Sequence, residues 1–215
     1  MSLLRGLTTF RYNPERAFGN ATMLFSGLFA TALLAVHLLE PEMNQGPVSF
    51  YSLGSYGFIM RFGFLVFGLA FFSLVLGLRY LQGITNVRYV VTALLSIAGT
   101  GLVLIGLFNA DPLGNSPTTQ GVVHSWSANV WSIGASVGAL SFAPAFRQGD
   151  KPLTVARKSR NLGMAALAVW AAGFFVYGTY LAPIQPRLFF MLEAAWVILI
   201  GSRLREGKLA TVNGD

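Results

Sequence analysis

Six long apolar runs, separated by short polar segments, dominate the sequence. Each run has about the length of the roughly 20 apolar residues that a helix needs to cross a bilayer. Apolar and polar positions do not alternate along them, as they would over about 10 residues in each strand of an outer-membrane barrel. The pattern therefore predicts six transmembrane helices, over Thr22–Leu39, Gly57–Leu78, Tyr89–Phe108, Val122–Phe146, Leu162–Leu181 and Leu188–Leu204.

The composition agrees with this pattern and excludes other classes of protein. Hydrophobic residues make up 54% of the 215 residues and charged residues 11%, whereas a soluble domain carries about 25% charged residues. So few charges cannot cover a water-facing surface, and disorder requires the opposite balance. The chain contains no cysteine, which excludes a disulfide scaffold, a cysteine-ligated metal centre and a thiol nucleophile. We predict an all-α integral membrane protein whose six-helix bundle spans residues 22–204.

Basic residues are confined almost entirely to alternate connections. All of the 15 lysines and arginines except Arg61 and Arg187 lie before the first run, in the second and fourth connections, or at and after the end of the sixth run. The positive-inside rule places these segments in the cytoplasm. The sequence thus predicts a bacterial or archaeal cytoplasmic membrane protein, with cytoplasmic residues 1–21 and a mobile cytoplasmic tail over residues 205–215. The basic stretch Arg147–Arg160 is interpreted as a topology signal in contact with anionic lipid, and not as a nucleic-acid site.

Several charged or titratable side chains interrupt or border the apolar runs. Such groups are costly in a bilayer and are therefore candidates for function. In the predicted topology most of them lie in the outer third of the membrane, where a six-helix bundle would gather them in one outward-facing polar cavity. The predicted ligand-binding residues of this cavity are His37, Arg61, Arg187, Glu193 and Trp131, and Asp111 and His124 complete its lining.

Three chemistries fit these residue types. In the first, His124 is a general base, Asp111 orients it, and Ser125, Ser127 or a water molecule attacks an ester. In the second, His37 and His124 bind a metal ion together with a neighbouring carboxylate. In the third, the same two histidines are axial ligands of a b-type haem. The sequence leaves these alternatives open and identifies no cofactor.

The same residues also have structural interpretations. Arg61 and Glu193 fit an ion pair between the second and sixth runs, because an isolated charge is so costly inside a membrane. The segment Asn109–Pro112 has the residues of a helix-terminating turn. Phosphate-binding loops, dinucleotide fingerprints and the metalloprotease helix motif are absent from the sequence, which argues against an ATP-driven pump.

A series of short motifs occurs in a fixed order, namely Ser52–Gly57, Gly99–Gly101, Phe108–Pro112 and His124–Ala128. Their order resembles that in the bacterial and archaeal membrane proteins grouped as the domain of unknown function 998 family, which have a similar length and number of predicted spans. The sharpest parts are the Phe–x–x–Asp–Pro turn and the His–Ser–x–x–Ala entry into the fourth run. The resemblance implies that Asp111 and His124 form a linked pair, and it implies no established activity.

The leading hypothesis is a cavity open to the outer leaflet that binds a lipid or another amphipathic ligand, with hydrolysis or transfer as the reaction. The second is a non-catalytic subunit that packs against other membrane-protein subunits through its glycine-rich helix faces. A haem protein is the third, and a proton- or ion-coupled transporter that uses Arg61 and Glu193 is the fourth. Expected partners are therefore membrane lipids or other membrane proteins.

Overall fold

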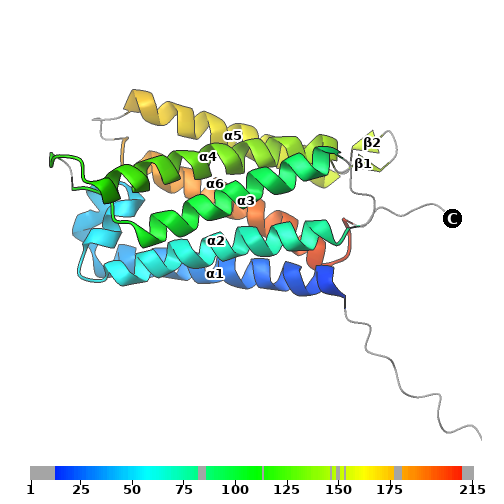
Figure 1. Ribbon diagram of the computed structural model, residues 1–215, viewed down its shortest axis with the longest axis horizontal. Coiled ribbons are helices and arrows are strands. Elements are labelled where there is room, and N and C mark those ends of the chain that lie inside the picture. Colours follow the sequence, from blue (N-terminus) through cyan, green and yellow to red (C-terminus); the bar gives the residue numbers. More distant parts are fainter. Residues whose placement is uncertain are drawn as a thin grey trace, which may run out of the picture.

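The computed structural model describes residues 13–81, 86–112, 114–145, 147–148, 151–152, 154–176 and 181–209. Six long helices make up most of this part of the chain (Figure 1). They are α1 (Pro14–Leu39), α2 (Gly57–Arg79), α3 (Asn86–Leu107), α4 (Thr119–Ala145), α5 (Thr154–Val176) and α6 (Ile184–Arg205). Two short 3₁₀ helices, η1 (Pro41–Gln45) and η2 (Val48–Leu53), connect α1 to α2, and an antiparallel pair of two-residue strands, β1 (Arg147–Gln148) and β2 (Lys151–Pro152), follows α4.

The six apolar runs are confirmed as helices, but every helix except α2 begins earlier than predicted, and α1 and α5 begin two full turns earlier. Helix α1 begins at Pro14 because Asn13 caps it: the Asn13 side chain accepts a hydrogen bond from the Arg16 amide at 3.1 Å, and proline suits the first helical position. Helix α5 begins at Thr154, eight residues before its apolar part. Hydropathy detects only the apolar part of a helix, whereas the backbone continues through a polar first turn.

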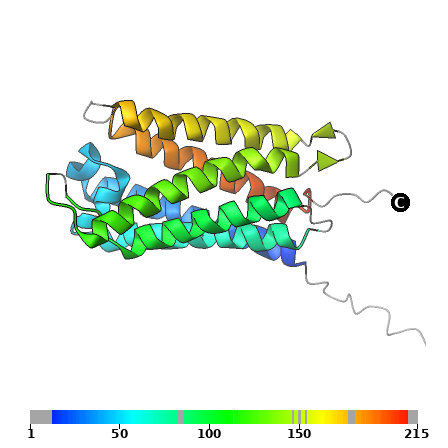
Figure 2. The ribbon, with the colours of Figure 1, turned by 45° about the horizontal axis from the view of Figure 1, so that its top comes forward.

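Five of the six long helices in the described residues are long and apolar enough to cross a membrane, and α4 is the exception. Polar residues along α4 lower its hydropathy, and four of them, His124, Ser127, Ser132 and Ser136, are buried inside the bundle. Helix α4 lies alongside α3 and α5 (Figure 2). The protein is therefore a multi-pass, all-α membrane protein, as predicted, while the cytoplasmic position of its termini and its bacterial or archaeal membrane stay predictions.

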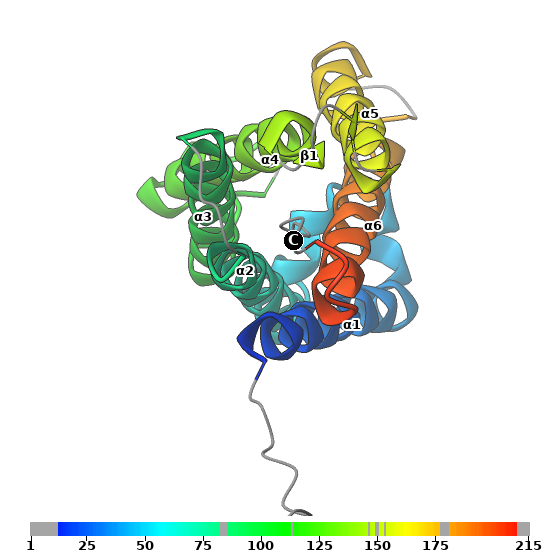
Figure 3. The same cartoon turned by 90° about the vertical axis from the view of Figure 1, so that its right-hand side faces the viewer.

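The helices follow one another in chain order around the bundle, and α6 closes the ring against α1 (Figure 3). Helix α6 also contacts α2 and α4 across the ring. The α1–α2 and α3–α4 connections, the end of α5 and the start of α6 lie at one end, which we call the distal end. Helix α1 begins and α6 ends at the opposite end, which we call the terminal end (Figure 1). This order brings the distal ends of α1 and α6 together and, separately, those of α3 and α4.

Aromatic rings fill the interior between the helices. Phe29 of α1 stacks on Phe67 of α2 with ring centroids 4.3 Å apart, and Phe190 of α6 lies 5.4 Å from Phe29. The indole nitrogen of Trp196 donates to Ser159 Oγ at 2.7 Å, and that hydroxyl donates to the carbonyl of Ala139 at 2.7 Å. This chain of hydrogen bonds joins α6, α5 and α4 and satisfies the buried indole nitrogen of Trp196 and the buried hydroxyl of Ser159.

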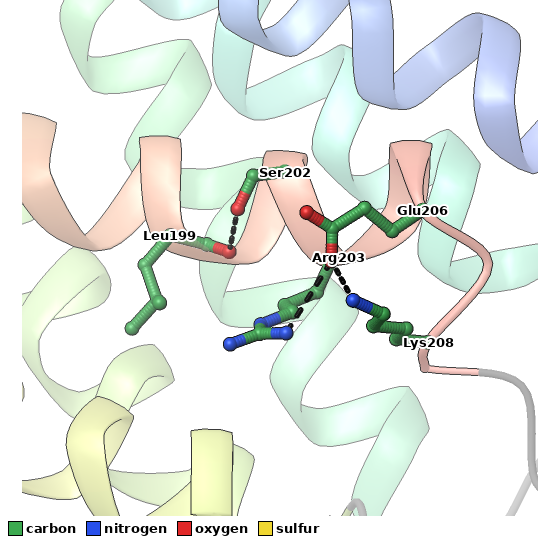
Figure 4. A network of polar contacts seen from close by, with 5 residues as sticks. All are labelled: Leu199, Ser202, Arg203, Glu206 and Lys208. Carbon is green, nitrogen blue, oxygen red and sulfur yellow. Dashed lines mark hydrogen bonds and ion pairs between the residues drawn. The ribbon is translucent and has the colours of Figure 1, made fainter.

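A small cluster of charges closes α6 at the terminal end (Figure 4). Glu206 Oε2 lies 2.9 Å from Lys208 Nζ and 3.3 Å from Arg203 Nη1. The hydrogen bond from Lys208 lowers the pKa of Glu206 below its ordinary value, and the positive charges of Lys208 and Arg203 act in the same direction.

Leu209, in the segment predicted to be a mobile tail, is buried. The rest of that predicted tail, residues 210–215, and residues 1–12 lie outside the described residues.

Candidate functional site

The connection between α3 and α4 is organised around Asp111. The amide and the hydroxyl of Thr118 donate to the two Asp111 carboxylate oxygens at 2.9 Å and 2.7 Å. Thr118 Oγ1 in turn accepts the amide of Gly121 at 3.1 Å, so Thr118 is the N-cap of α4. The carboxylate thus lies at the positive end of the α4 dipole. The hydrogen bonds from the side chain and backbone of Thr118 lower the pKa of Asp111 below its ordinary value, with a smaller contribution from His124.

His124, on the second turn of α4, also contacts the connection between α3 and α4. Its Nδ1 lies 2.8 Å from the carbonyl oxygen of Phe108, so it donates to the end of α3, and the side chain is only 4% exposed. We call the Asp111–Thr118 and His124–Phe108 contacts together the α3–α4 clamp. Phe108, Asp111 and His124, which belong to the motifs Phe108–Pro112 and His124–Ala128, each contribute to one of its contacts.

The α3–α4 clamp differs from a catalytic triad. In a triad the carboxylate orients the base through His Nδ1, but here that atom donates to Phe108. The Asp111 oxygens accept from Thr118, and the structure gives no hydrogen bond between His124 and Ser125 or Ser127 among the described residues. Asp111 and His124 are therefore linked through the connection that they close, and the arrangement fits a structural role better than ester hydrolysis.

The clamp leads to a prediction about stability. Replacing His124 by alanine leaves the carbonyl of the half-buried Phe108 without its partner, which costs about 1–3 kcal/mol. We expect a lower temperature of thermal unfolding in detergent for His124→Ala. Val122→Ala, a truncation of an exposed residue on the same turn of α4, is the matched control and should change the temperature little. Equal stability of the two variants would show that the contact contributes nothing.

Two adjacent pockets open on the surface beside the clamp. The first, which we call the Asp111 pocket, has a volume of about 300 Å³. The second, which we call the α3–α4 groove, has a volume of about 290 Å³. Trp126 belongs to both and is 70% exposed. The Asp111 pocket is lined by Asp111, Asn115, Pro117, Gly121, Val122, Ser125 and Trp126, and the α3–α4 groove by Ser96, Ile97, Thr100, Gly101, Leu104, Trp126, Ser127 and Val130.

The α3–α4 groove is apolar although it contains hydroxyl groups. Ser96 and Thr100 donate to the carbonyls of Thr92 and Ser96 at 2.8 Å and 3.0 Å, so their hydroxyls are satisfied within α3. Gly101 forms the floor, since a Cβ atom there would lie 2.8 Å from the carbonyl oxygen of Ser127. Along α3 the groove runs from Ser96 to Leu104, about 12 Å at about 1.5 Å per residue.

Arg187 is the centre of a second set of polar contacts at the distal end. It donates from Nε to His37 Nε2 at 2.9 Å, from Nη2 to the Tyr51 hydroxyl at 3.1 Å, and from Nη1 to the carbonyls of Gly46, at 3.0 Å, and Pro183. We call these contacts the Arg187 network. They join α6 to α1 and to the α1–α2 connection.

Both nitrogens of His37 are engaged in this region. Its Nδ1 donates to the Leu33 carbonyl at 2.7 Å, and its Nε2 accepts from Arg187. A histidine in this state has no free nitrogen for a metal or a haem iron, so it does not fit the predicted ligand sets. Among the residues that the structure describes, no three His, Asp or Glu side chains are grouped so that they could hold a metal ion.

The predicted ion pair between Arg61 and Glu193 is wrong. Glu193 is 1% exposed and accepts a hydrogen bond from Ser136 of α4 through Oε1 at 3.0 Å, while its Oε2 has no partner. Arg61 Nε is also buried without a partner. The two residues differ in depth, because Arg61 lies about 6 Å into α2 and Glu193 about 13 Å into α6 at about 1.5 Å per residue.

Trp131 lies in the aromatic interior and lines neither of the two surface pockets. It is 3% exposed, and its ring packs against Phe189 and Phe190 of α6 at centroid distances of 5.1 Å and 4.4 Å. Like Glu193, it joins α4 to α6. The polar residues expected in one cavity are thus distributed among the α3–α4 clamp, the Arg187 network and the interior contacts of α4 with α6.

Sequence reasoning missed three residues that shape these sites. Thr118 had a detectable signal, because a threonine directly before a helical segment is a common N-cap. Glycine is needed at position 121 because a Cβ atom there would overlap the Asp111 carboxylate. No local sequence pattern indicates that Asp111 comes so close to Gly121. Tyr51 meets Arg187, which is 136 residues away in the sequence, and only the tertiary fold brings them together.

Comparison with known proteins gives one family. The model of the family described as "Protein of unknown function (DUF998)" matches residues 23–203. This range contains the α3–α4 clamp, the Arg187 network and nearly all of α1 to α6. No curated protein and no solved structure matches the chain.

Proposed function

Because the chain belongs to the DUF998 family, whose description states no activity, we propose a function from the chain's own surface: it binds a lipid or a similar amphipathic molecule at the distal end of α3 and α4. The observation that carries this proposal is the junction of the two pockets. The Asp111 pocket, which holds the polar side chains of Asp111, Asn115 and Ser125, shares Trp126 with the more apolar α3–α4 groove. This order of surfaces matches a molecule with a polar head and an apolar chain.

The position of Trp126 supports this interpretation. Trp126 is seven residues from the start of α4, about 10 Å along the helix, at the depth where tryptophan is enriched at membrane interfaces. The ring faces outward, where a lipid reaches it without entering the bundle. A head group in the Asp111 pocket then lies near water, and one chain lies beside Ile97, Leu104 and Val130.

The proposal concerns binding and not turnover. Hydrolysis needs a base, an orienting acid and a nucleophile within hydrogen-bond reach of one another, whereas His124 and Asp111 are engaged in the α3–α4 clamp. Binding needs only the two pockets.

A side chain that fills the α3–α4 groove tests the proposal. Thr100 is exposed on the groove wall, so Thr100→Trp should occupy the groove without entering the bundle. We expect the affinity for one phospholipid, measured by native mass spectrometry of delipidated protein, to fall about tenfold, which corresponds to about 1.4 kcal/mol. The control is Leu34→Trp at an exposed position of α1, which should leave the affinity unchanged. Equal lipid binding by both variants would reject the groove as the site.

A further inference from the structure

The Asp111 pocket presents a negative charge that the protein does not neutralise. Asp111 accepts hydrogen bonds from Thr118, which is neutral. The ion pairs of the described residues involve Glu206 at the terminal end, so Asp111 has no cationic partner among them. No lysine or arginine lines the pocket. A partly exposed carboxylate in a pocket without a cation is complementary to a positively charged ligand group.

Trp126 adds a second element that favours a cation. Its indole ring lines the same pocket and is 70% exposed. An ammonium group within about 6 Å of the centre of a tryptophan ring is attracted to its face. A carboxylate and an indole ring that line the same pocket suit the recognition of an ammonium group, whereas a head group with only negative charge would meet repulsion from Asp111.

Neutral polar groups complete the pocket. The Asn115 amide and the Ser125 hydroxyl both line it, and both side chains can donate hydrogen bonds to a phosphate. A zwitterionic phospholipid carries its phosphate between the ammonium group and the acyl chains. The Asp111 pocket therefore offers groups for the ammonium and the phosphate of such a lipid, and the α3–α4 groove offers an apolar surface for one of its chains.

We infer that the lipid bound at this site is a phospholipid with an ammonium head group of the ethanolamine type, recognised by Asp111 and Trp126. This inference rests on the proposed function and specifies its ligand. It assigns Asp111 a binding role in addition to its contact with Thr118. The low pKa of Asp111 that results from the Thr118 hydrogen bonds is consistent with it, because the carboxylate then keeps its charge in mildly acidic solution.

The experiment compares two lipids with identical acyl chains, phosphatidylethanolamine and phosphatidylglycerol, by native mass spectrometry of delipidated protein. We expect the wild-type protein to bind phosphatidylethanolamine on the order of five times more tightly, the size expected for one exposed charge contact. Asp111→Asn keeps an oxygen that accepts from Thr118 but removes the charge. It should bind both lipids equally, with its affinity for phosphatidylglycerol no lower than that of the wild-type protein.

A second measurement, the salt dependence of lipid binding, uses the wild-type protein and therefore does not depend on the folding of a variant. Raising the salt concentration shortens the screening length to about 3 Å at 1 M, so the preference of the wild-type protein should decrease while its binding of phosphatidylglycerol persists. Trp126→Leu should also reduce the preference. Equal binding of the two lipids by the wild-type protein, or a preference that survives both Asp111→Asn and high salt, would overturn the inference.

The two proposals fail in different ways. If the wild-type protein binds both lipids equally and Thr100→Trp weakens both, the groove binds lipid but the head-group inference is wrong. If Thr100→Trp weakens neither lipid, the proposed function itself is wrong.

Discussion

Replacing Arg187 by alanine should lower the stability of the protein by about 3 kcal/mol, because it removes charge-assisted hydrogen bonds that each contribute about 1.5–3 kcal/mol in protected positions. The side chain donates to His37, Tyr51, Gly46 and Pro183, so its loss separates the distal ends of α1 and α6 from the connection between α1 and α2. For a chain of this size the expected shift is about 6–12 °C in thermal unfolding.

Two variants serve as controls for this prediction. Arg187→Lys keeps the charge but cannot reproduce the forked geometry of the guanidinium group, so we expect an intermediate loss of stability. Arg203→Ala removes an arginine from the other end of the same helix, where its ion pair with Glu206 is partly exposed and such pairs contribute about 0–1 kcal/mol. A melting temperature of Arg187→Ala as high as that of Arg203→Ala would contradict the importance of the Arg187 network.

The second large effect is expected at Gly19, where α1 crosses the terminal end of α6. A Cβ atom at this position would lie 2.5 Å from the backbone nitrogen of Arg205 and 2.8 Å from the carbonyl oxygen of Gly201. Both atoms belong to the α6 backbone, so the overlap can be relieved only by moving a helix. We expect Gly19→Val to destabilise the fold by about 3 kcal/mol, the upper part of the range for overpacking.

Gly27→Val is the matched control, because Gly27 lies two turns later on α1 and a Cβ atom there meets nothing within 4 Å. It should change stability by less than about 0.5 kcal/mol. Thermal unfolding of both variants in the same detergent tests the pair. Similar melting temperatures for the two variants would show that α1 and α6 do not depend on this close approach.

The number, type and approximate position of the long helices could be predicted from the sequence. An apolar stretch long enough to cross a bilayer forms a helix, because every backbone N–H and C=O group must then find its hydrogen-bond partner within the segment. Helix α4 is instructive, since its serines and histidine lower its hydropathy without ending it. Four of these residues, His124, Ser127, Ser132 and Ser136, are buried in the bundle, so the run is less apolar than its neighbours although it packs between α3 and α5.

The candidate site could be predicted only in part. The family resemblance implied a link between Asp111 and His124, and in the structure each of them contacts a different residue of the α3–α4 clamp. The assumption that both join His37 and Glu193 in one cavity depended on the order of the helices around the bundle, which hydropathy does not contain. Glu193 meets Ser136 instead of Arg61, because depth and helix face select its partner.

The sequence by itself determined that the chain is a bundle of membrane helices and which residues border its polar edges. Those properties depend on local composition, since transfer of a segment from water to lipid is nearly a sum over its residues. Only the tertiary structure decided which polar groups meet. Each such contact requires the helices to lie at a particular rotation and height, as for Arg187 with Tyr51, Glu193 with Ser136, and the two pockets that share Trp126. Packing of side chains over the whole bundle sets that placement.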